Sequence, residues 1–227
     1  MQKLHSRLNA HTRPVPVAHI LFFVALILFV GIALAVTLGS DLTAVDLSVA
    51  AWFHRRATPL LADGMAAISF LGAPTSLTLV AVAGSIMLLT RQRRVESAAL
   101  SMVVLGGALL NIGLKHLFER GRPVLDDPLF TLPTYSFPSG HAMASTVFYG
   151  LLATYFWQNR ATRPWALIAI GAATLMVALV CLSRVYLGLH YLSDVLGGVA
   201  EGVAWLALSS IVWHRFRRDG AYVDVSR

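Results

Sequence analysis

The sequence predicts an all-α, polytopic membrane protein: a six-transmembrane-helix bundle with short interfacial helices between the first and second spans. Three observations support this fold class. Hydrophobic residues make up 57% of the 227 residues and charged residues only 13%, whereas a soluble domain is usually about 45–50% apolar and about 25% charged. The apolar residues are gathered in runs long enough to cross a hydrocarbon core of about 30 Å. Most Lys and Arg residues lie at the ends of these runs.

Six apolar runs are expected to form the spans, and each is interpreted as a helix. They cover residues 18–38, 75–90, 97–118, 141–157, 165–182 and 191–213. The second and fourth runs are short and need flanking residues to span the core. The first run follows a basic head and contains Ala33-Leu34-Ala35, which is similar to a signal-peptide cleavage site. Its length, about 21 residues, exceeds a usual signal core and favours a retained transmembrane helix.

The distribution of cations predicts the orientation in the membrane. With a cytoplasmic N-terminus, the inside segments carry twelve Lys and Arg residues and the outside segments five; Lys115 is left out because it lies within a predicted helix. This excess favours cytoplasmic N- and C-termini in a cell inner (plasma) membrane. The net charge of +7 is therefore attributed to topology, and nucleic acid is not expected as a partner.

Residues 39–74 form the longest connection, and their pattern predicts two short amphipathic helices at the membrane interface. Apolar residues recur at helical spacing from Leu42 to Phe53 and again from Leu61 to Leu71, the second series following a helix start at Thr58-Pro59. The segment could be a lid packed on the bundle, a surface through which lipid enters, or both. Residues 1–227 are expected to form a single domain, with a motif core at 115–194 and cytoplasmic tails at 1–17 and 214–227.

Two segments place polar residues at the predicted outer ends of the third and fourth runs, where such residues are costly and indicate a functional site. The first runs from Lys115 to Arg122-Pro123. The second is Pro138-Ser139-Gly140-His141. The unpaired N–H groups and positive dipole end of a helix start bind phosphate, and Gly140 lets an anion approach the backbone closely. Taken singly, a Lys at the interface and an ordinary helix cap explain the two segments equally well.

A third segment contains Ser183-Arg184, His190 and Asp194. His190 and Asp194 are four residues apart, which places them on one face of a helix. The carboxylate can accept a hydrogen bond from one ring nitrogen, fix the tautomer and leave the other nitrogen free to attack. A buried His-Asp pair with a purely structural role is the alternative.

The predicted topology delivers all three segments to the same side of the membrane, and together they are more specific than any one alone. They supply three cations, two histidines, a carboxylate, a hydroxyl and a helix start. No acidic pair suits magnesium and no His cluster suits zinc, so neither a metal nor a cofactor is expected. The set fits metal-free phosphoryl transfer, in which cations neutralise the non-bridging oxygens, one His attacks and the other protonates the leaving oxygen.

The three segments resemble the signature of the type 2 phosphatidic acid phosphatase superfamily, which also includes vanadium-dependent haloperoxidases. That signature reads K-x-x-x-x-x-x-R-P, P-S-G-H and S-R-x-x-x-x-x-H-x-x-x-D. Each defining residue is present in order, and the list is Lys115, Arg122, Pro123, Pro138, Ser139, Gly140, His141, Ser183, Arg184, His190 and Asp194. The motifs span residues 115–194, and the six predicted helices extend the likeness over most of the chain.

The resemblance implies a role for each matching residue. His190 would be the nucleophile that forms a phosphohistidine, Asp194 would orient it, and His141 would be the general acid. The phosphate would be held by Lys115, Arg122, Ser139, Gly140 and Arg184. Water would then release inorganic phosphate without a metal, and vanadate would inhibit.

Other polar residues near these motifs are given weaker interpretations. Glu201 is expected to hydrogen-bond inside the bundle, with a part in proton or substrate handling as the alternative. A solvated loop is expected for His116, Glu119 and Arg120. Asp126 and Asp127 would repel misplaced anions or simply be exposed, and pocket-lining or interfacial roles are open for Tyr186 and Tyr191.

The function expected from these features is hydrolysis of a lipid phosphate at the outer face of the membrane, because the short connections leave no soluble domain to enclose a water-soluble substrate. The expected substrates are undecaprenyl diphosphate, phosphatidic acid or phosphatidylglycerophosphate, with a slight preference for the first. The alternatives are a lipid phosphotransferase using the same site and a non-catalytic membrane scaffold. A haloperoxidase is disfavoured because those members are soluble.

Overall fold

The computed structural model describes residues 15–39, 41–123, 134–159 and 161–224, and no strand occurs within these ranges. The helices follow one another as α2 (Val15–Thr37), α3 (Asp41–His54), α4 (Pro59–Leu71), α5 (Pro74–Thr90), α6 (Arg94–Phe118), α7 (Gly140–Gln158), a 3-10 turn η2 (Arg163–Trp165), α8 (Ala166–Tyr186) and α9 (Leu192–Asp224). The all-α prediction is confirmed for the described residues. Each of the six apolar runs lies largely within one helix.

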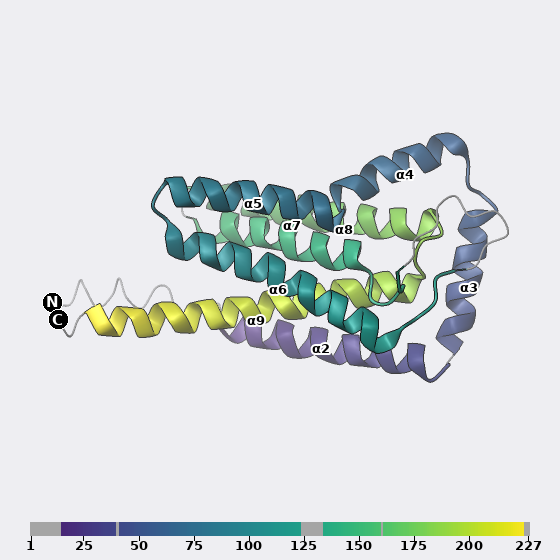
Figure 1. Ribbon diagram of the computed structural model, residues 1–227, viewed down its shortest axis with the longest axis horizontal. Coiled ribbons are helices and arrows are strands. Elements are labelled where there is room, and N and C mark those ends of the chain that lie inside the picture. Colours follow the sequence, from purple (N-terminus) through teal and green to yellow (C-terminus); the bar gives the residue numbers. More distant parts are fainter. Residues whose placement is uncertain (1–14, 40, 124–133, 160, 225–227) are drawn as a thin grey trace.

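The long helices run side by side as a bundle with α7 at its centre (Figure 1). α7 packs against α5, α6, α8 and α9, and α2 lies along α9. The outer faces of the surrounding helices carry large exposed apolar side chains, among them Phe23, Ile27, Leu79, Met102, Leu109 and Leu167. Such a surface is suited to hydrocarbon and not to water, as expected of a multi-pass membrane protein.

Small residues let α9 approach α7 closely. A Cβ atom added at Gly202 would lie 2.7 Å from Thr146 Cβ and 3.0 Å from the Met143 carbonyl oxygen, and one added at Gly198 would lie 3.0 Å from Ala142 Cβ. These positions leave no room for a side chain, as is common where transmembrane helices pack together. The close approach sets the start of α7 directly beside the start of α9.

Five stretches of the described residues are long and apolar enough to cross a membrane: Val17–Thr37, Pro59–Thr90, Arg94–Phe118, Arg163–Tyr186 and Leu192–Arg217. The fourth predicted span, now α7, is not among them. α7 has 19 residues and buries polar side chains such as Ser145 and Thr146. Four helices pack against α7, and the side chains of its first half are largely buried among them, so this half does not need a uniformly apolar surface. The count of six spans therefore stays a prediction.

The two helices predicted within residues 39–74 are present as α3 and α4. Thr58 precedes α4 in an extended conformation and Pro59 is its first residue, as the sequence indicates. α3 lies across one end of the bundle and α4 slants away from α5 at that end (Figure 1). α3 packs on α8 and α9, and α4 packs on α8. The expectation that this segment packs on the bundle is confirmed.

Candidate active site

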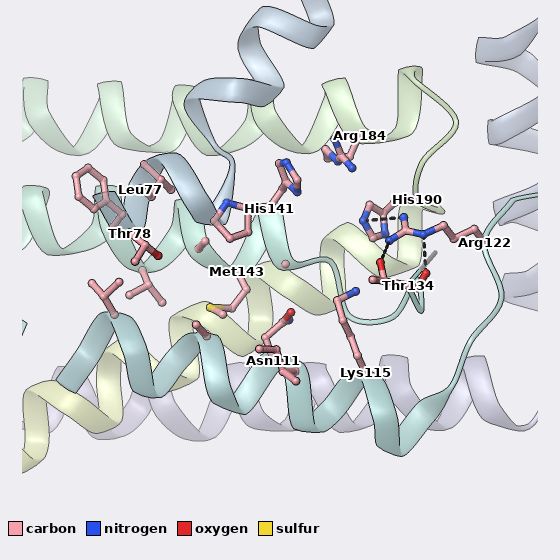
Figure 2. A pocket seen from close by; sticks show the side chains of 18 residues that line it. Leu77, Thr78, Asn111, Lys115, Arg122, Thr134, His141, Met143, Arg184 and His190 are labelled. Atoms are coloured by element: carbon pink, nitrogen blue, oxygen red, sulfur yellow. Dashed lines mark hydrogen bonds between the residues drawn. The ribbon is translucent and has the colours of Figure 1, made fainter. Parts of the chain in front are cut away.

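The three polar segments meet at the end of the bundle where α3 lies (Figures 1 and 2). α6 delivers Lys115 in its last turn, the start of α7 delivers His141, and the end of α8 delivers Arg184. His190 lies in the short connection between α8 and α9, and Asp194 lies in the first turn of α9. The site is therefore assembled from four helix ends that are distant in sequence.

The start of α7 is shaped as an anion-binding terminus. Ser139 is the N-cap, and its hydroxyl accepts a hydrogen bond from the Ala142 N–H at 3.5 Å. The Ser139 N–H donates to the carbonyl oxygen of Asp194 at 2.9 Å, which ties the start of α7 to the start of α9. Gly140 faces Asn111, whose Oδ1 would lie 3.0 Å from an added Cβ. The remaining N–H groups of the first turn are available to bind phosphate.

Arg122 is held by the backbone on either side of the site. Its Nε donates to the Thr134 carbonyl oxygen at 2.7 Å, and its Nη2 donates to Thr134 Oγ1 at 2.8 Å. Its Nη1 donates to the Leu189 carbonyl oxygen at 2.5 Å and lies 3.4 Å from His190 Nε2. This planar fork is fixed next to the predicted nucleophile, a placement that a flexible Lys ammonium would not reproduce.

Lys115 and Arg184 complete the set of predicted phosphate-binding cations. The Lys115 ammonium donates to the Tyr135 carbonyl oxygen at 2.7 Å. Arg184 is only 4% exposed. Its Nη1 donates to Ser69 Oγ of α4 at 2.7 Å, and within the described part of the chain its Nε and Nη2 have no hydrogen-bond partner. A buried guanidinium with two unsatisfied nitrogens is unusual in proteins and is suited to receive an anion.

His190 and Asp194 are paired as predicted, but the expectation that they share one helix face is wrong, because His190 precedes the start of α9 at Leu192. His190 Nδ1 lies 3.4 Å from Asp194 Oδ2, and both side chains are at most 2% exposed. The same oxygen accepts the Tyr191 N–H at 2.9 Å. Burial lowers the pKa of His190 to about 4 against the opposing effect of Asp194. The imidazole is therefore neutral at neutral pH, with Nδ1 facing the carboxylate and Nε2 facing Arg122.

A cavity of about 300 Å³ joins these groups to the interior of the bundle (Figure 2). At one end it is lined by the cations and histidines Lys115, Arg122, Arg184, His141 and His190. Towards the other end the lining is mostly apolar and comes from α5, α6 and α7, with Leu77, Val104, Ala108, Ile112, Val147 and Phe148. The cavity is thus polar where a phosphate would bind and apolar where a lipid chain would follow.

Arg120 is not the solvated loop residue that the sequence suggests, and that expectation is wrong. Its side chain is 13% exposed and forms two ion pairs, from Nη1 to Asp194 Oδ1 at 2.6 Å and from Nη2 to Asp46 Oδ2 at 2.8 Å. Asp46 of α3 is fully buried. Sequence analysis missed Asp46, although a signal exists: it lies on the same helix face as Leu42, Val49 and Phe53, where an unpaired carboxylate would be costly.

The other weakly interpreted residues divide between packing and solvent. Glu201 Oε2 accepts from Asn111 Nδ2 at 2.8 Å, which confirms a hydrogen bond inside the bundle. His116 and Glu119 are exposed, as expected. The Tyr186 hydroxyl accepts a hydrogen bond from the Thr58 N–H at 3.1 Å, and the Tyr191 ring lies under the Arg120 guanidinium at 4.4 Å. Both side chains therefore contact residues next to the site. Asp126 and Asp127 lie outside the described residues.

No group of three or more His, Cys, Asp or Glu side chains that could hold a metal ion occurs among the described residues. The polar groups around the cavity are instead donors with affinity for anions. This donor set resembles a phosphate site more than a cation site.

Comparison with known proteins places the chain in a family. Residues 95–218, more than half of the chain, match the PAP2 superfamily. The chain belongs to the PAP2 superfamily. Phosphatidylglycerophosphatase B of Bacillus subtilis (strain 168) is 36% identical to this PAP2 protein over 149 residues, covering 64% of the chain and 71% of the relative. The putative undecaprenyl-diphosphatase YbjG of Escherichia coli (strain K12) is 29% identical over 166 residues, covering 69% and 78%.

A solved structure supports the same assignment. The crystal structure of a transmembrane PAP2-type phosphatidylglycerolphosphate phosphatase from Bacillus subtilis matches with a TM-score of 0.74 and 28% identity, over 87% of this chain and 96% of that one. The PAP2 protein described here is therefore a membrane-embedded phosphoric ester hydrolase of the lipid phosphatase family.

Proposed function

We propose that this chain hydrolyses a lipid phosphate ester or diphosphate through a phosphohistidine on His190, without a metal. The observation that carries the proposal is the arrangement of one cavity: a neutral, buried His190 and the ring of His141 line its polar end beside three cations. The three cations at this end, Lys115, Arg122 and Arg184, can neutralise the charge that a transferring phosphoryl group develops on its oxygens.

The proposed reaction has two steps. In the first, the His190 Nε2 lone pair attacks phosphorus, the bond from phosphorus to the leaving oxygen breaks, and His141 donates a proton to that oxygen. In the second, His141 takes a proton from water, the water oxygen attacks phosphorus, and the bond to His190 Nε2 breaks to release inorganic phosphate. Asp194, facing Nδ1 at 3.4 Å, stabilises the positive charge that the ring carries in the phosphoenzyme.

The lipid part of the substrate is inferred from the cavity and from the relatives. The apolar lining contributed by α5, α6 and α7 continues from the phosphate end, so an acyl or isoprenoid chain can remain in an apolar environment while its headgroup reacts. The two bacterial relatives are named for phosphatidylglycerophosphate and undecaprenyl diphosphate. We propose these two lipids and phosphatidic acid as substrates to be compared, with the site at the outer membrane face.

The test is phosphate release by the purified protein in detergent containing EDTA. Undecaprenyl diphosphate, phosphatidylglycerophosphate, phosphatidic acid and a soluble monoester are assayed beside the His190→Ala variant. Release from a lipid that survives EDTA and is lost in His190→Ala is expected. Release that requires an added divalent cation would overturn the metal-free mechanism, and activity in His190→Ala would overturn the phosphohistidine. Transfer to an added alcohol in place of water would indicate the phosphotransferase.

A further inference from the structure

A polar cluster centred on Asp46, which lies outside the three motifs, connects α3 to the proposed nucleophile. Asp46 of α3 is fully buried and accepts hydrogen bonds from the Ser193 N–H at 2.9 Å, from Ser193 Oγ, and from Arg120 Nη2 at 2.8 Å. Asp46, a residue of α3, therefore caps the first turn of α9. That turn carries Asp194.

Arg120 is the central member of this cluster. While Nη2 binds Asp46, Nη1 binds Asp194 Oδ1 at 2.6 Å and Ser193 Oγ at 2.7 Å. Its guanidinium also stacks on the Tyr191 ring at 4.4 Å. One planar cation thus bridges two buried carboxylates, and its geometry is fixed from both sides.

This bridge determines how Asp194 faces His190. Oδ1 is occupied by Arg120, which leaves Oδ2 for His190 Nδ1 and the Tyr191 N–H. Without Asp46, Arg120 would lose the partner that holds its second nitrogen, and the Asp194 carboxylate would be free to rotate with it. A carboxylate that fixes the tautomer and ring orientation of a functional His depends on such supporting contacts.

We infer that Asp46 is a positioning residue for the reaction, acting through Arg120 and Asp194 on His190. The inference rests on the proposed function, because it assigns Asp46 to the nucleophile proposed there. It makes α3 a working part of the site and not only a covering of the bundle end. Asp46 does not line the cavity that would hold the phosphate, whose described lining includes neither Asp46 nor Arg120.

Because Asp46 lies outside the cavity, its substitution should change kcat without changing substrate or phosphate binding. Lys115, Arg122 and Arg184 bind the phosphate independently of Asp46, so Asp46→Asn should leave KM and the inhibition constant of inorganic phosphate within about twofold of wild type. The kcat should fall by about 10- to 100-fold, the range found when an outer hydrogen-bond partner of a functional His is removed. If Asp46 only anchored α3, loosening the helix beside α8 and α9 would change substrate binding and kcat together.

The deciding experiment is a double-mutant cycle on kcat, using the lipid of the panel that is hydrolysed fastest. Asp46→Asn, Arg120→Lys and the double variant are compared with Asp41→Asn, which removes an exposed carboxylate from the same helix and should behave as wild type. The Lys ammonium keeps the charge of Arg120 but cannot bridge both carboxylates. If Asp46 acts through Arg120, the kcat of the double variant should lie within about threefold of the kcat of the slower single variant.

Three results would overturn the inference: wild-type kcat in folded Asp46→Asn, losses that multiply in the double variant, or a kcat loss accompanied by equal changes in KM and phosphate inhibition. If Asp46→Asn does not yield folded protein, Arg120→Lys decides alone, and wild-type kcat in that variant contradicts the bridge. If His190→Ala releases no phosphate and Asp46→Asn has the kcat of wild type, only the inference on Asp46 is overturned and the proposed function stands. Activity in His190→Ala removes the proposed function and this inference with it.

Discussion

Arg184 is a predicted phosphate ligand whose guanidinium is only partly hydrogen-bonded within the described residues. One of its three nitrogens is bound to Ser69 Oγ, and the other two face the interior without a partner within the described residues. Ser69 comes from α4, outside all three motifs, and is 5% exposed. The contact therefore fixes the guanidinium from behind while its free N–H groups remain available for an anion.

Ser69→Ala should weaken phosphate binding because it removes this anchor. A hydrogen bond to a charged group contributes about 1.5–3 kcal/mol, so KM and the inhibition constant of inorganic phosphate should rise by about 10- to 150-fold. Steady-state kinetics with phosphate as inhibitor measures both constants. Ser48→Ala is the matched control, since the Ser48 hydroxyl is exposed and donates to the Ala44 carbonyl oxygen of its own helix. Equal phosphate affinity in Ser69→Ala and wild type would show that Arg184 does not need this contact.

At the scale of single residues, the side chains that line the cavity could be predicted from the sequence better than the side chains that hydrogen-bond to them from other helices. Short-range spacing explains why: His190 and Asp194 are four residues apart, and each motif is compact. Asp46 and Arg120 are 74 residues apart, and Arg184 and Ser69 are 115 apart. No local periodicity links such pairs, so their contacts follow only from how α3 and α4 pack on α8 and α9.

At the scale of helices, the contact between α7 and α9 fixes the two halves of the site relative to each other. α7 begins at the proposed anion-binding turn, Asp194 lies in the first turn of α9, and the Ser139 N–H donates to the Asp194 carbonyl oxygen. Gly198 and Gly202 allow the separation between the helices that this bond requires. Packing of these helices and geometry of the site are therefore linked.

Gly202→Ala should lower both stability and activity. The added methyl group would meet Thr146 and the Met143 carbonyl oxygen, and overpacking of this kind costs about 1–3 kcal/mol. A lower melting temperature in detergent and a reduced kcat are expected. Gly171→Ala on α8 is the control, because an added Cβ there meets nothing within 4 Å and Ala favours the helix. A Gly202→Ala variant that melts at or above the wild-type temperature would contradict the tight contact.

The helix bounds were predictable where Gly or clustered Arg follows a hydrophobic run, as at Gly39 after α2 and Arg91 after α5, whereas α9 continues to Asp224, beyond the predicted end at residue 213. The starts of α4 at Pro59 and of α5 at Pro74 show how local these signals are. The environment of α7 was less predictable. Its sequence resembles a weak span, and only the packed structure shows that four other helices enclose it.

At the scale of the whole molecule, the two ends of the bundle differ in charge and in chemistry. The α5–α6 connection, with Arg91, Arg93 and Arg94, lies at the end opposite α3 and the candidate site (Figure 1). The excess of cations in the predicted inside segments predicts that this end lies in the cytoplasm. The orientation of the site towards the outside follows from this prediction.

Cysteine labelling can check the orientation. In a Cys181→Ala background, which removes the single native cysteine, Arg55→Cys between α3 and α4 and Arg91→Cys after α5 place exposed thiols at opposite ends. A membrane-impermeant maleimide added to intact cells should label Arg55→Cys and not Arg91→Cys. Both should react after the membrane is permeabilised, which controls for accessibility. The reverse pattern in intact cells would place the site on the cytoplasmic face.

The bridge formed by Asp46, Arg120 and Asp194 also limits how the protein can diverge. Loss of Asp46 alone removes the hydrogen-bond acceptor of Arg120 Nη2 and of the Ser193 N–H at the start of α9. Loss of Arg120 alone leaves two buried carboxylates without their shared cation. Single substitutions at either position are therefore disfavoured, although neither is a defining residue of a family motif. Among homologous sequences, these two positions are expected to change together. Paired changes at the two positions, and not strict conservation of either residue, would then be the evidence for the contact.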